Sequence, residues 1–330
     1  MSLKVNFIFR SKSKEFNSIE GVFETIINSF GTGIIANKLY LPKEGANLFS
    51  LISNLAYCKS LKGQINHITG HVNYISLILG KCTILTIHDI QSATSGNFLK
   101  KIVINFFWFK LPALLAKRIT VISEFTKNEL IQLLPEVESK VRVIHNPVNP
   151  RFQVKSSKPF DEGLPIILAL GTKKNKNLER IVQAMEGISA TLLIIGKLSI
   201  EQIQLLENSS VSYVNKYYLS WEEIFNVYET CDLLCFPSLY EGFGMPIIEA
   251  QAMGKPVITS DLGAMAEVAG NAAFLVNPYS YLEIRQAITK IIADGEFRAK
   301  LVTEGFKNVK RFDPKFIAQK YQELYLSLTS

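Results

Sequence analysis

Residues 231–260, CDLLCFPSLYEGFGMPIIEAQAMGKPVITS, contain the pattern that decides the fold. The apolar run Leu233 to Phe236 is short enough for a buried parallel strand. The segment Glu241-Gly242-Phe243-Gly244 then forms a turn, and Pro246 suits the first residue of a helix because its missing N–H costs nothing there. The helix runs to Gly254, a residue typical of a helix C-terminus, and a second strand follows. The stretch therefore predicts a strand, a glycine turn, a helix and a strand.

The start of this helix predicts an anion site. The first backbone N–H groups of a helix have no intrahelical partner, and the helix dipole is positive at the same end. Glu241 lies in the turn and Glu249 one turn into the helix, where side chains lean toward the N-terminus. A nucleotide sugar would suit this site, because its diphosphate could bind the amides and its hydroxyl groups could bind the two carboxylates. The alternative is an ordinary turn with two solvated glutamates. The residues predicted to bind the donor here are Gly242, Phe243, Gly244, Met245 and Glu249.

The composition is that of an ordinary globular protein with room for two domains. Of 330 residues, 48% are hydrophobic and 20% are charged. The N-terminus predicts a first strand and not a secretory signal, and no apolar run reaches the about 18 residues of a membrane span. The four cysteines lie mostly in apolar runs and are expected to be reduced thiols. These features predict a cytoplasmic protein.

The net charge of +7 is concentrated in the first half of the chain. Residues 1–150 hold 17 Lys and Arg against 9 Asp and Glu, whereas residues 151–330 hold 19 against 20. The basic half predicts an anionic partner, such as a membrane surface at its inner face or a phosphorylated acceptor, or simply a solvated surface. The segment 99–118, LKKIVINFFWFKLPALLAKR, predicts either a core helix or a basic aromatic membrane-docking surface. No RNA-binding or helix-turn-helix signature supports nucleic acid.

Strands alternate with helices along the chain, which predicts an α/β fold of two Rossmann-like, doubly wound parallel-sheet domains. Residues 165–311, which contain the predicted nucleotide-sugar site, are expected to form the nucleotide-sugar-binding domain, and residues 1–150 are expected to form the acceptor-side domain. Residues 151–164, RFQVKSSKPFDEGL, have a linker composition, and residues 312–330 predict a terminal helix. Two such domains place a ligand in the cleft between the carboxyl ends of their strands.

Two further clusters suit this ligand. In Gly171-Thr172-Lys173-Lys174-Asn175-Lys176, a glycine ends a strand and lysines precede a helix, a pattern that suits a diphosphate or is merely a basic surface turn. His88 ends a buried strand, where a histidine is either structural or part of the site. His67 and His71 flank another strand end and are acceptor-side candidates. They are not spaced on a helix as metal ligands would be, so no metal is expected.

The motifs resemble those of the retaining family 4 glycosyltransferases. The resemblance rests on Glu241 and Glu249 around GFGMPII, on EAQAMGKPVITS, and on Glu267 in MAEVAG. It implies a GT-B fold whose last helix crosses back to the first domain. It also implies that Lys176 holds the donor diphosphate and that His88 contacts the donor sugar. Ser123 in VISEFTK and Asn146 in IHNPVN resemble further family segments.

The chain departs from the family pattern at two places. Thr172 stands where the family usually has an arginine, so Lys173 or Lys174 is expected to supply the second cation. The paired-glycine loop after the first strand is replaced by EFNSIEG at residues 15–21. Either the amides of Asn17 and Ser18 contact the donor phosphate, or the second domain alone holds it.

The predicted function is therefore retaining, metal-independent transfer of a sugar from a nucleoside-diphosphate sugar to a hydroxyl acceptor, without a cofactor. The catalytic candidates are Glu241, His88 and Lys176. A saccharide or lipid-linked acceptor in surface polysaccharide or glycolipid assembly is expected. The alternatives are a sugar-nucleotide epimerase of the same fold and a non-catalytic module that binds nucleotide sugar or nucleic acid. The base is expected near residues 214–218.

Overall fold

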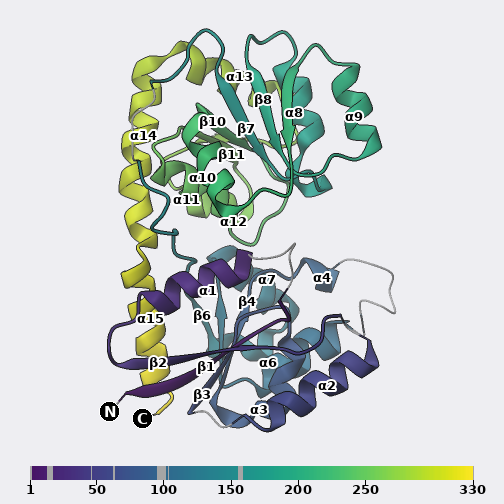
Figure 1. The fold of residues 1–330 in the computed structure, drawn as a ribbon, viewed down its shortest axis with the longest axis vertical. Helices are drawn as coiled ribbons and strands as arrows, with labels where there is room; N and C mark the ends of the chain where they lie inside the picture. Colours follow the sequence, from purple (N-terminus) through teal and green to yellow (C-terminus); the bar gives the residue numbers. More distant parts are fainter. Residues whose placement is uncertain are drawn as a thin grey trace. The chain divides into compact units, whose positions relative to one another are not determined.

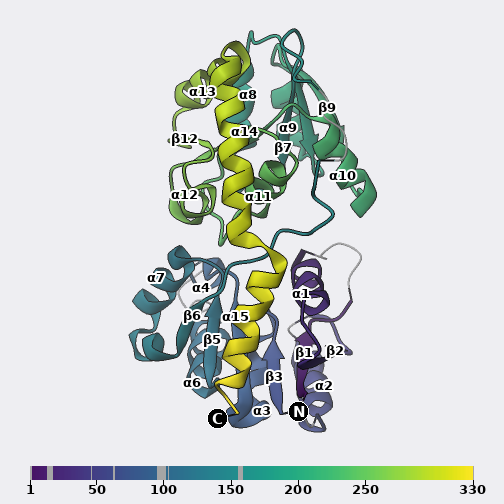
Figure 2. The ribbon, with the colours of Figure 1, turned by 90° about the vertical axis from the view of Figure 1, so that its left-hand side faces the viewer.

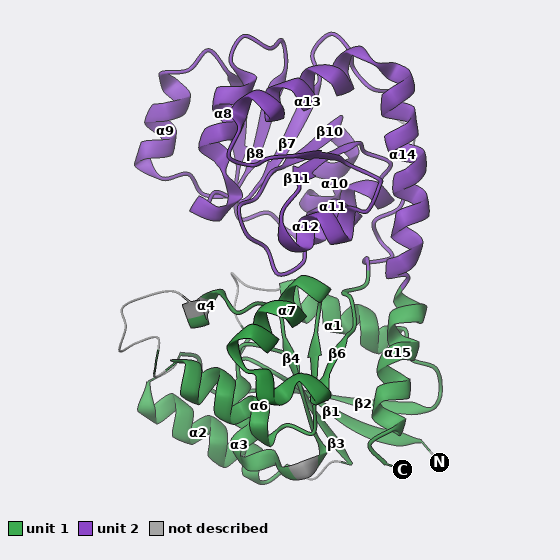
Figure 3. Ribbon diagram, turned by 180° about the vertical axis from the view of Figure 1, so that it is seen from behind, with its two compact units in different colours: residues 1–147, 314–330 green, residues 148–313 purple. Residues whose placement is uncertain are grey.

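The computed structural model describes residues 2–12, 18–45, 47–61, 64–94, 102, 104–154 and 159–329. The chain forms two compact units, the first made of residues 1–147 and 314–330 and the second of residues 148–313 (Figure 3). Each unit is built on one six-stranded parallel sheet surrounded by helices (Figure 1). The predicted fold class, α/β with two doubly wound parallel sheets, is confirmed.

Unit 1 has a sheet in the order β2-β1-β3-β4-β5-β6. Its strands are β1 (Leu3–Phe9), β2 (Ile34–Tyr40), β3 (Ile65–Ile68), β4 (Thr83–Ile87), β5 (Arg118–Val121) and β6 (Val141–Val143). Its α-helices are α1 (Ser18–Asn28), α2 (Leu48–Lys59), α3 (Ser76–Leu79), α4 (Gln91–Thr94), α6 (Leu111–Leu115), α7 (Glu124–Leu133) and α15 (Pro314–Leu326). The 3₁₀ helices are η1 (Asn73–Ile75), η2 (Gly80–Cys82) and η4 (Pro135–Lys140), and η3 (Asn105–Lys110) is a π-helix.

The winding of unit 1 reverses between β1 and β3, since β2 lies on one side of β1 and all later strands on the other. Ligands of open α/β sheets bind at such a switch point, outside the carboxyl ends of the strands. The central strands β3 and β4 are buried along their whole length. Their apolar runs are typical of strands covered on both faces.

The C-terminal helix α15 belongs to unit 1, where it lies beside α1 (Figure 2). It buries Ile317, Tyr321 and Tyr325. The Tyr325 hydroxyl lies 2.7 Å from Nδ1 of His67 in β3, so a polar contact as well as apolar burial attaches this helix to the sheet.

Unit 2 has a sheet in the order β12-β11-β10-β7-β8-β9. Its strands are β7 (Ile166–Leu170), β8 (Thr191–Ile195), β9 (Ser212–Lys216), β10 (Leu233–Phe236), β11 (Val257–Ser260) and β12 (Phe274–Val276). Its α-helices are α8 (Leu178–Met185), α9 (Ile200–Glu207), α10 (Trp221–Thr230), α11 (Met245–Ala252), α12 (Gly263–Ala269), α13 (Tyr281–Ala293) and α14 (Gly295–Val309), and its 3₁₀ helices are η5 (Lys174–Lys176) and η6 (Lys310–Phe312).

Read from β9, this order is the Rossmann order 3-2-1-4-5-6, and its switch point lies between β7 and β10. The stretch 231–260 supplies β10, α11 and β11, as predicted. Ser220 and Glu223 form a capping box at the start of α10. The loops after β7 and β10 therefore meet at one edge of the sheet.

Residues 151–164, for which the sequence predicts a linker, lie within unit 2. Phe152 is 3% exposed and packs with its ring centroid 4.5 Å from that of Phe225. The Asp161 amide donates to Oδ1 of Asp232, whose Oδ2 accepts from the Ile166 amide at 2.8 Å. The composition of this segment is polar, but the rings of Phe152 and Phe160, the carboxylate of Asp232 and an ion pair between Glu162 and Arg298 attach it to the domain.

The cysteines that the structure describes are free thiols. Burial raises the pKa of Cys58 and of Cys235 to about 12, so both are neutral. Among the described residues, no helix combines the length and hydrophobicity needed to cross a bilayer.

Candidate active site

Lys176 and Glu241 meet at the switch point of unit 2. Lys176 follows β7 and Glu241 follows β10, and Nζ of the lysine lies 2.7 Å from Oε1 of the glutamate. The side chains are 21% and 17% exposed, respectively, so the pair is partly shielded yet open to a ligand. The Lys176 ammonium also lies 4.7 Å from the ring centroid of Phe236. A cation is thus held in place before any ligand arrives.

The loop after β7 has the backbone that this arrangement requires. Gly171 has φ +89°, and a Cβ there would lie 2.9 Å from Cγ of Lys176. Asn177 adopts the left-handed conformation with φ 63°, and its buried amide donates to the carbonyls of Pro237 and Pro278. The Asn175 carbonyl accepts from the Leu239 amide at 2.8 Å. These bonds fix the loop after β7 to the loop after β10.

The glycine turn of residues 242–245 leads into α11. Gly244 has φ 106°, and a Cβ there would lie 2.9 Å from Cδ1 of Ile247, so a glycine is needed. Met245 begins the helix, one residue before the predicted start at Pro246. The Phe243 side chain is 3% exposed and packs edge-on against Phe312. The side chain of Phe243 is therefore not available to a ligand.

Glu249 is held by Tyr228 of α10. The Tyr228 hydroxyl donates to Oε2 of Glu249 at 2.7 Å. Burial raises the pKa of Glu249 to about 7, and the hydrogen bond from Tyr228 opposes that rise. No sequence pattern singles out Tyr228, because its partner lies 21 residues away on a different helix.

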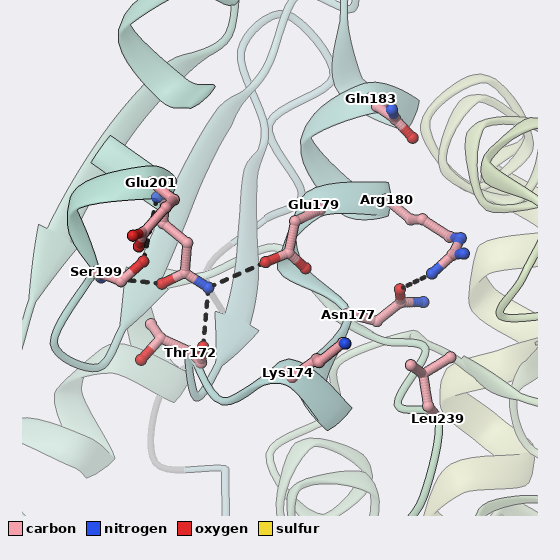
Figure 4. Close-up of a pocket in the computed structure, with 10 residues that line it drawn as sticks. Thr172, Lys174, Asn177, Glu179, Arg180, Gln183, Ser199, Glu201 and Leu239 are labelled. Carbon is pink, nitrogen blue, oxygen red and sulfur yellow. Dashed lines mark hydrogen bonds between the residues drawn. The ribbon is translucent and has the colours of Figure 1, made fainter. Parts of the chain in front are cut away.

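Lys173 and Lys174 are exposed, and neither is placed at Glu241. Lys174 lines a cavity of about 680 Å³ between the beginnings of α8 and α9 (Figure 4). In this cavity Gln202 donates to the Thr172 carbonyl at 2.8 Å and to Glu179 (Figure 4). Of the three lysines, the structure therefore brings only Lys176 to the carboxylate at the switch point.

In unit 1, His88 follows β4 and lies against the turn after β3. Its Nε2 lies 2.7 Å from the Thr69 carbonyl, which can only accept, so Nε2 carries the proton. Burial lowers the pKa of His88 to about 4. Neutral His88 therefore has a lone pair on Nδ1. Gly70 has φ +135°, and a Cβ there would lie 2.5 Å from Cδ2 of His88, so only glycine fits beside the ring.

His71 lies beside His88, with the two rings stacked at a centroid distance of 6.2 Å. The His71 backbone has φ 59°, and its carbonyl accepts from the indole of Trp108 at 3.3 Å. Desolvation lowers the pKa of His71. The structure thus brings His71 and His88 together, as expected of residues of one site.

His67 lies in the core of unit 1 and not in the turn. It is fully buried in β3, with Nε2 2.7 Å from the Thr86 hydroxyl and Nδ1 2.7 Å from that of Tyr325. Both ring nitrogens are used, and burial lowers the pKa of His67 to about 3. The expectation that His67 contacts the acceptor does not fit this position, because its ring connects the sheet to α15.

The N-terminal candidates are Asn17, which lies outside the described residues, and Ser18, the exposed first residue of α1. Sequence reasoning missed Arg10, which follows β1 at the switch point of unit 1. Its guanidinium donates to both carboxylate oxygens of Glu20, at 2.8 and 3.0 Å. A charged residue directly after a first strand was the signal available. Within the described residues, no cluster of three His, Cys, Asp or Glu side chains is placed to hold a metal.

Comparison with known proteins decides the family. The profile described as glycosyl transferases group 1 matches residues 151–308, and that described as glycosyltransferase family 4 matches residues 36–152. The chain belongs to the group 1 glycosyltransferases of family 4. The chain is therefore a glycosyltransferase, as predicted.

Relatives and solved structures agree with this family. The chain is 26% identical over 252 residues to the O-antigen chain mannosyltransferase RfbU of Salmonella typhimurium, with 71% of this chain and 69% of the relative covered. It is 25% identical over 269 residues to the capsular polysaccharide biosynthesis glycosyltransferase CapM of Staphylococcus aureus, covering 73% and 69%. The structure of Anabaena HepE in complex with UDP and glucose superposes with a TM-score of 0.76 at 16% identity, covering 98% and 100%. The predicted GT-B fold is confirmed.

Proposed function

We propose that this glycosyltransferase moves a sugar from a nucleoside-diphosphate sugar to a hydroxyl acceptor with retention of anomeric configuration. The observation that carries the proposal is the Lys176–Glu241 pair at the switch point of unit 2, next to the start of α11. It combines a fixed cation, a carboxylate and helix amides at one sheet edge.

Lys176 would neutralise the charge that develops on the departing diphosphate, together with the amides of the turn 242–245. Glu241, released from Lys176 by the competing phosphate, would accept hydrogen bonds from sugar hydroxyls. Glu249 would accept a hydrogen bond from the nucleotide ribose. HepE, a protein of the same fold, has been solved with UDP and glucose, which supports a nucleotide-sugar donor.

His88 would contact the donor sugar as a hydrogen-bond acceptor. Its Nε2 proton is committed to the Thr69 carbonyl, so Nδ1 is left to accept from a sugar hydroxyl. Because its pKa is lowered to about 4, His88 stays neutral at pH 7 and would not act as a general acid.

Retention would follow from attack of the acceptor on the face of the sugar that the diphosphate leaves. The bond from the anomeric carbon to the phosphate oxygen breaks, the acceptor oxygen bonds to that carbon, and the acceptor proton passes to the leaving phosphate. This course needs no protein nucleophile and no metal ion. The same-face course is the one that the resemblance to family 4 implies.

Turnover of nucleotide sugar by a Glu241→Ala variant tests the proposal. We expect kcat/KM to fall by about 100-fold, since misplacing the sugar at the reacting centre costs this much. Glu304→Ala is the matched control, because Glu304 also pairs with a lysine at 2.7 Å but on α14. Equal turnover by wild type and Glu241→Ala would contradict the assigned role. Epimerised donor formed without acceptor would instead indicate an epimerase.

We further propose an acceptor in surface polysaccharide or glycolipid assembly, contacted at a membrane surface by unit 1. The names of RfbU and CapM support the acceptor class. Leu48, Phe49 and Ile52 of α2 are among the more exposed apolar side chains, and Lys43 lies over the Phe49 ring. Basic and apolar side chains together suit an anionic interface. Phe49→Ser should reduce sedimentation with anionic vesicles, and equal sedimentation would contradict this contact.

A further inference from the structure

We infer that Tyr228 is a positioning residue for donor binding: it occupies one carboxylate oxygen of Glu249 and so presents the other oxygen to the ribose. The inference rests on the proposed role of Glu249. It gives Tyr228 a role in donor binding. It also predicts a change in the pH dependence of donor affinity, which a simple loss of packing would not cause.

The geometry leaves the Tyr228 hydroxyl little freedom. Tyr228 is fully buried, and its ring meets that of Phe152 edge-on at a centroid distance of 5.2 Å. Phe152 packs in turn on Phe225. With the ring clamped on α10, the hydroxyl points at Oε2 of Glu249, 2.7 Å away. A clamped donor fixes the rotamer of the carboxylate, because the carboxylate keeps this bond only in one orientation.

The hydrogen bond has one direction. Burial and the neighbouring Glu249 carboxylate raise the pKa of Tyr228 well above its ordinary value, so the phenol keeps its proton. It therefore donates, and Oε2 accepts. The two oxygens of Glu249 then differ, since Oε2 already accepts from Tyr228 and Oε1 can receive a ribose hydroxyl.

Tyr228 is also the group that keeps Glu249 ionisable near neutral pH. Burial raises the pKa of Glu249, and the Tyr228 hydroxyl is the influence that lowers it. Lys255, beyond the end of α11, donates to the carbonyls of Glu229 and Cys231. Cys235 of β10 is a neutral thiol.

Helices α12 and α14 also pack against α11. From α14, the amide of Asn308 bonds to Gln251, and Arg311 of η6 bonds to Asn308 and to the Glu267 carbonyl of α12. In the described part of unit 2, no charged side chain of these helices adds to the influences on the pKa of Glu249.

A ribose hydroxyl donates to a carboxylate more strongly than to a neutral carboxyl group, so donor binding favours ionised Glu249. Removal of the Tyr228 hydroxyl raises the pKa of Glu249 further and frees its rotamer. Donor affinity at neutral pH then falls, and part of it returns when the pH is raised.

The test is calorimetric titration of the full chain with UDP and with GDP between pH 5.5 and 9. For Tyr228→Phe we expect weaker binding at pH 7, by up to about tenfold for each unit by which the pKa of Glu249 rises, with the midpoint of the affinity profile moved to higher pH. The kcat at saturating donor should be unchanged. Tyr281→Phe, an exposed tyrosine of α13, is the matched control and should bind as wild type does.

Three outcomes separate the hypotheses. If Glu249→Gln weakens binding and flattens the pH profile while Tyr228→Phe moves neither affinity nor midpoint, the inference about Tyr228 fails alone. If Glu249→Gln binds nucleotide as wild type does, the proposed role of Glu249 fails. If Tyr228→Phe does not fold, Phe152→Leu decides, because it loosens the ring of Tyr228 and keeps the hydroxyl: weaker binding at pH 7 is expected, and binding as in wild type overturns the inference.

Discussion

The two switch points of this chain use different chemistry. In unit 2, the loops after β7 and β10 present an ion pair, Lys176 and Glu241, with 21% and 17% of the side chains exposed. In unit 1, the turns after β3 and β4 present two stacked histidines whose pKa values burial lowers. Unit 1 also holds an ion pair at this point, Arg10 with Glu20, so the two edges differ in the neutral histidines that unit 1 adds beside its charges.

The difference indicates what each edge can bind. A fixed lysine beside helix amides suits a diphosphate, whose charge it offsets. A neutral histidine whose N–H is committed, as that of His88 is to the Thr69 carbonyl, suits a hydroxyl, to which it offers a lone pair without the desolvation cost of a charge. Mutations and pH changes at the two edges should therefore affect nucleotide affinity and the stability of each unit differently.

The largest effect is expected from Gly70→Ala in unit 1. A Cβ at residue 70 would lie 2.5 Å from the His88 ring, and φ +135° disfavours any side chain. We expect unit 1 to lose about 3 kcal/mol of unfolding free energy, measured by urea denaturation. In unit 2, Gly171→Ala should cost less, because the group it meets is the flexible stem of Lys176.

Gly31→Ala is the control for both, since a Cβ there meets nothing within 4 Å. A Gly70→Ala variant as stable as Gly31→Ala would show that His88 is not held as described.

Next in size is loss of the fixed cation. Lys176→Gln should weaken UDP or GDP binding by about 10- to 100-fold, the equivalent of one charge-assisted hydrogen bond, with little change in stability. Lys174→Gln, on the exposed part of the same loop, should change affinity much less. Calorimetry measures the nucleotide affinity of both variants. Equal losses of affinity would mean that the two lysines contribute only their charge and not a defined contact.

A smaller effect is expected from pH, which should change the stability of the two units in opposite directions. His67 and His88 have pKa values lowered to about 3 and about 4, so unit 1 should lose stability as the pH falls below about 6.5. Glu249 has a pKa raised to about 7, so its contribution in unit 2 has the opposite sign, and stability should fall as the pH rises from about 4.5 through 7.

Hydrogen exchange of the strands of each unit across pH 4 to 8 would measure both trends. His67→Gln should flatten the acid response of unit 1 alone. Parallel responses of the two units would contradict the assignment of buried neutral histidines to unit 1.

How far the sequence predicts the site depends on how local each contact is. Glu241 and Glu249 could be predicted because a contiguous strand, turn and helix pattern places them at one sheet edge, whereas Lys176 is singled out by the resemblance to family 4. Tyr228 and Arg10 could not, since the first acts through a helix packed beside α11 and the second is defined by Glu20 across the turn.

His67 shows the opposite error. Its position near a strand end suggested a site residue, but its Nδ1 bonds to Tyr325, 258 residues later in the chain. Residues 151–164 similarly have a polar composition, yet the buried ring of Phe152 packs on Phe225 and helps to make this segment part of unit 2. Tertiary packing of this kind leaves no periodic signal in the sequence.

The central claim is that the charged edge of unit 2 binds a nucleoside diphosphate through Lys176. Calorimetric titration of the wild-type chain and of Lys176→Gln with UDP and GDP tests it most directly. The account predicts saturable binding of one of the two nucleotides by wild type and at least about tenfold weaker binding by the variant. No binding of either nucleotide by wild type, or equal affinity in the variant, would contradict it.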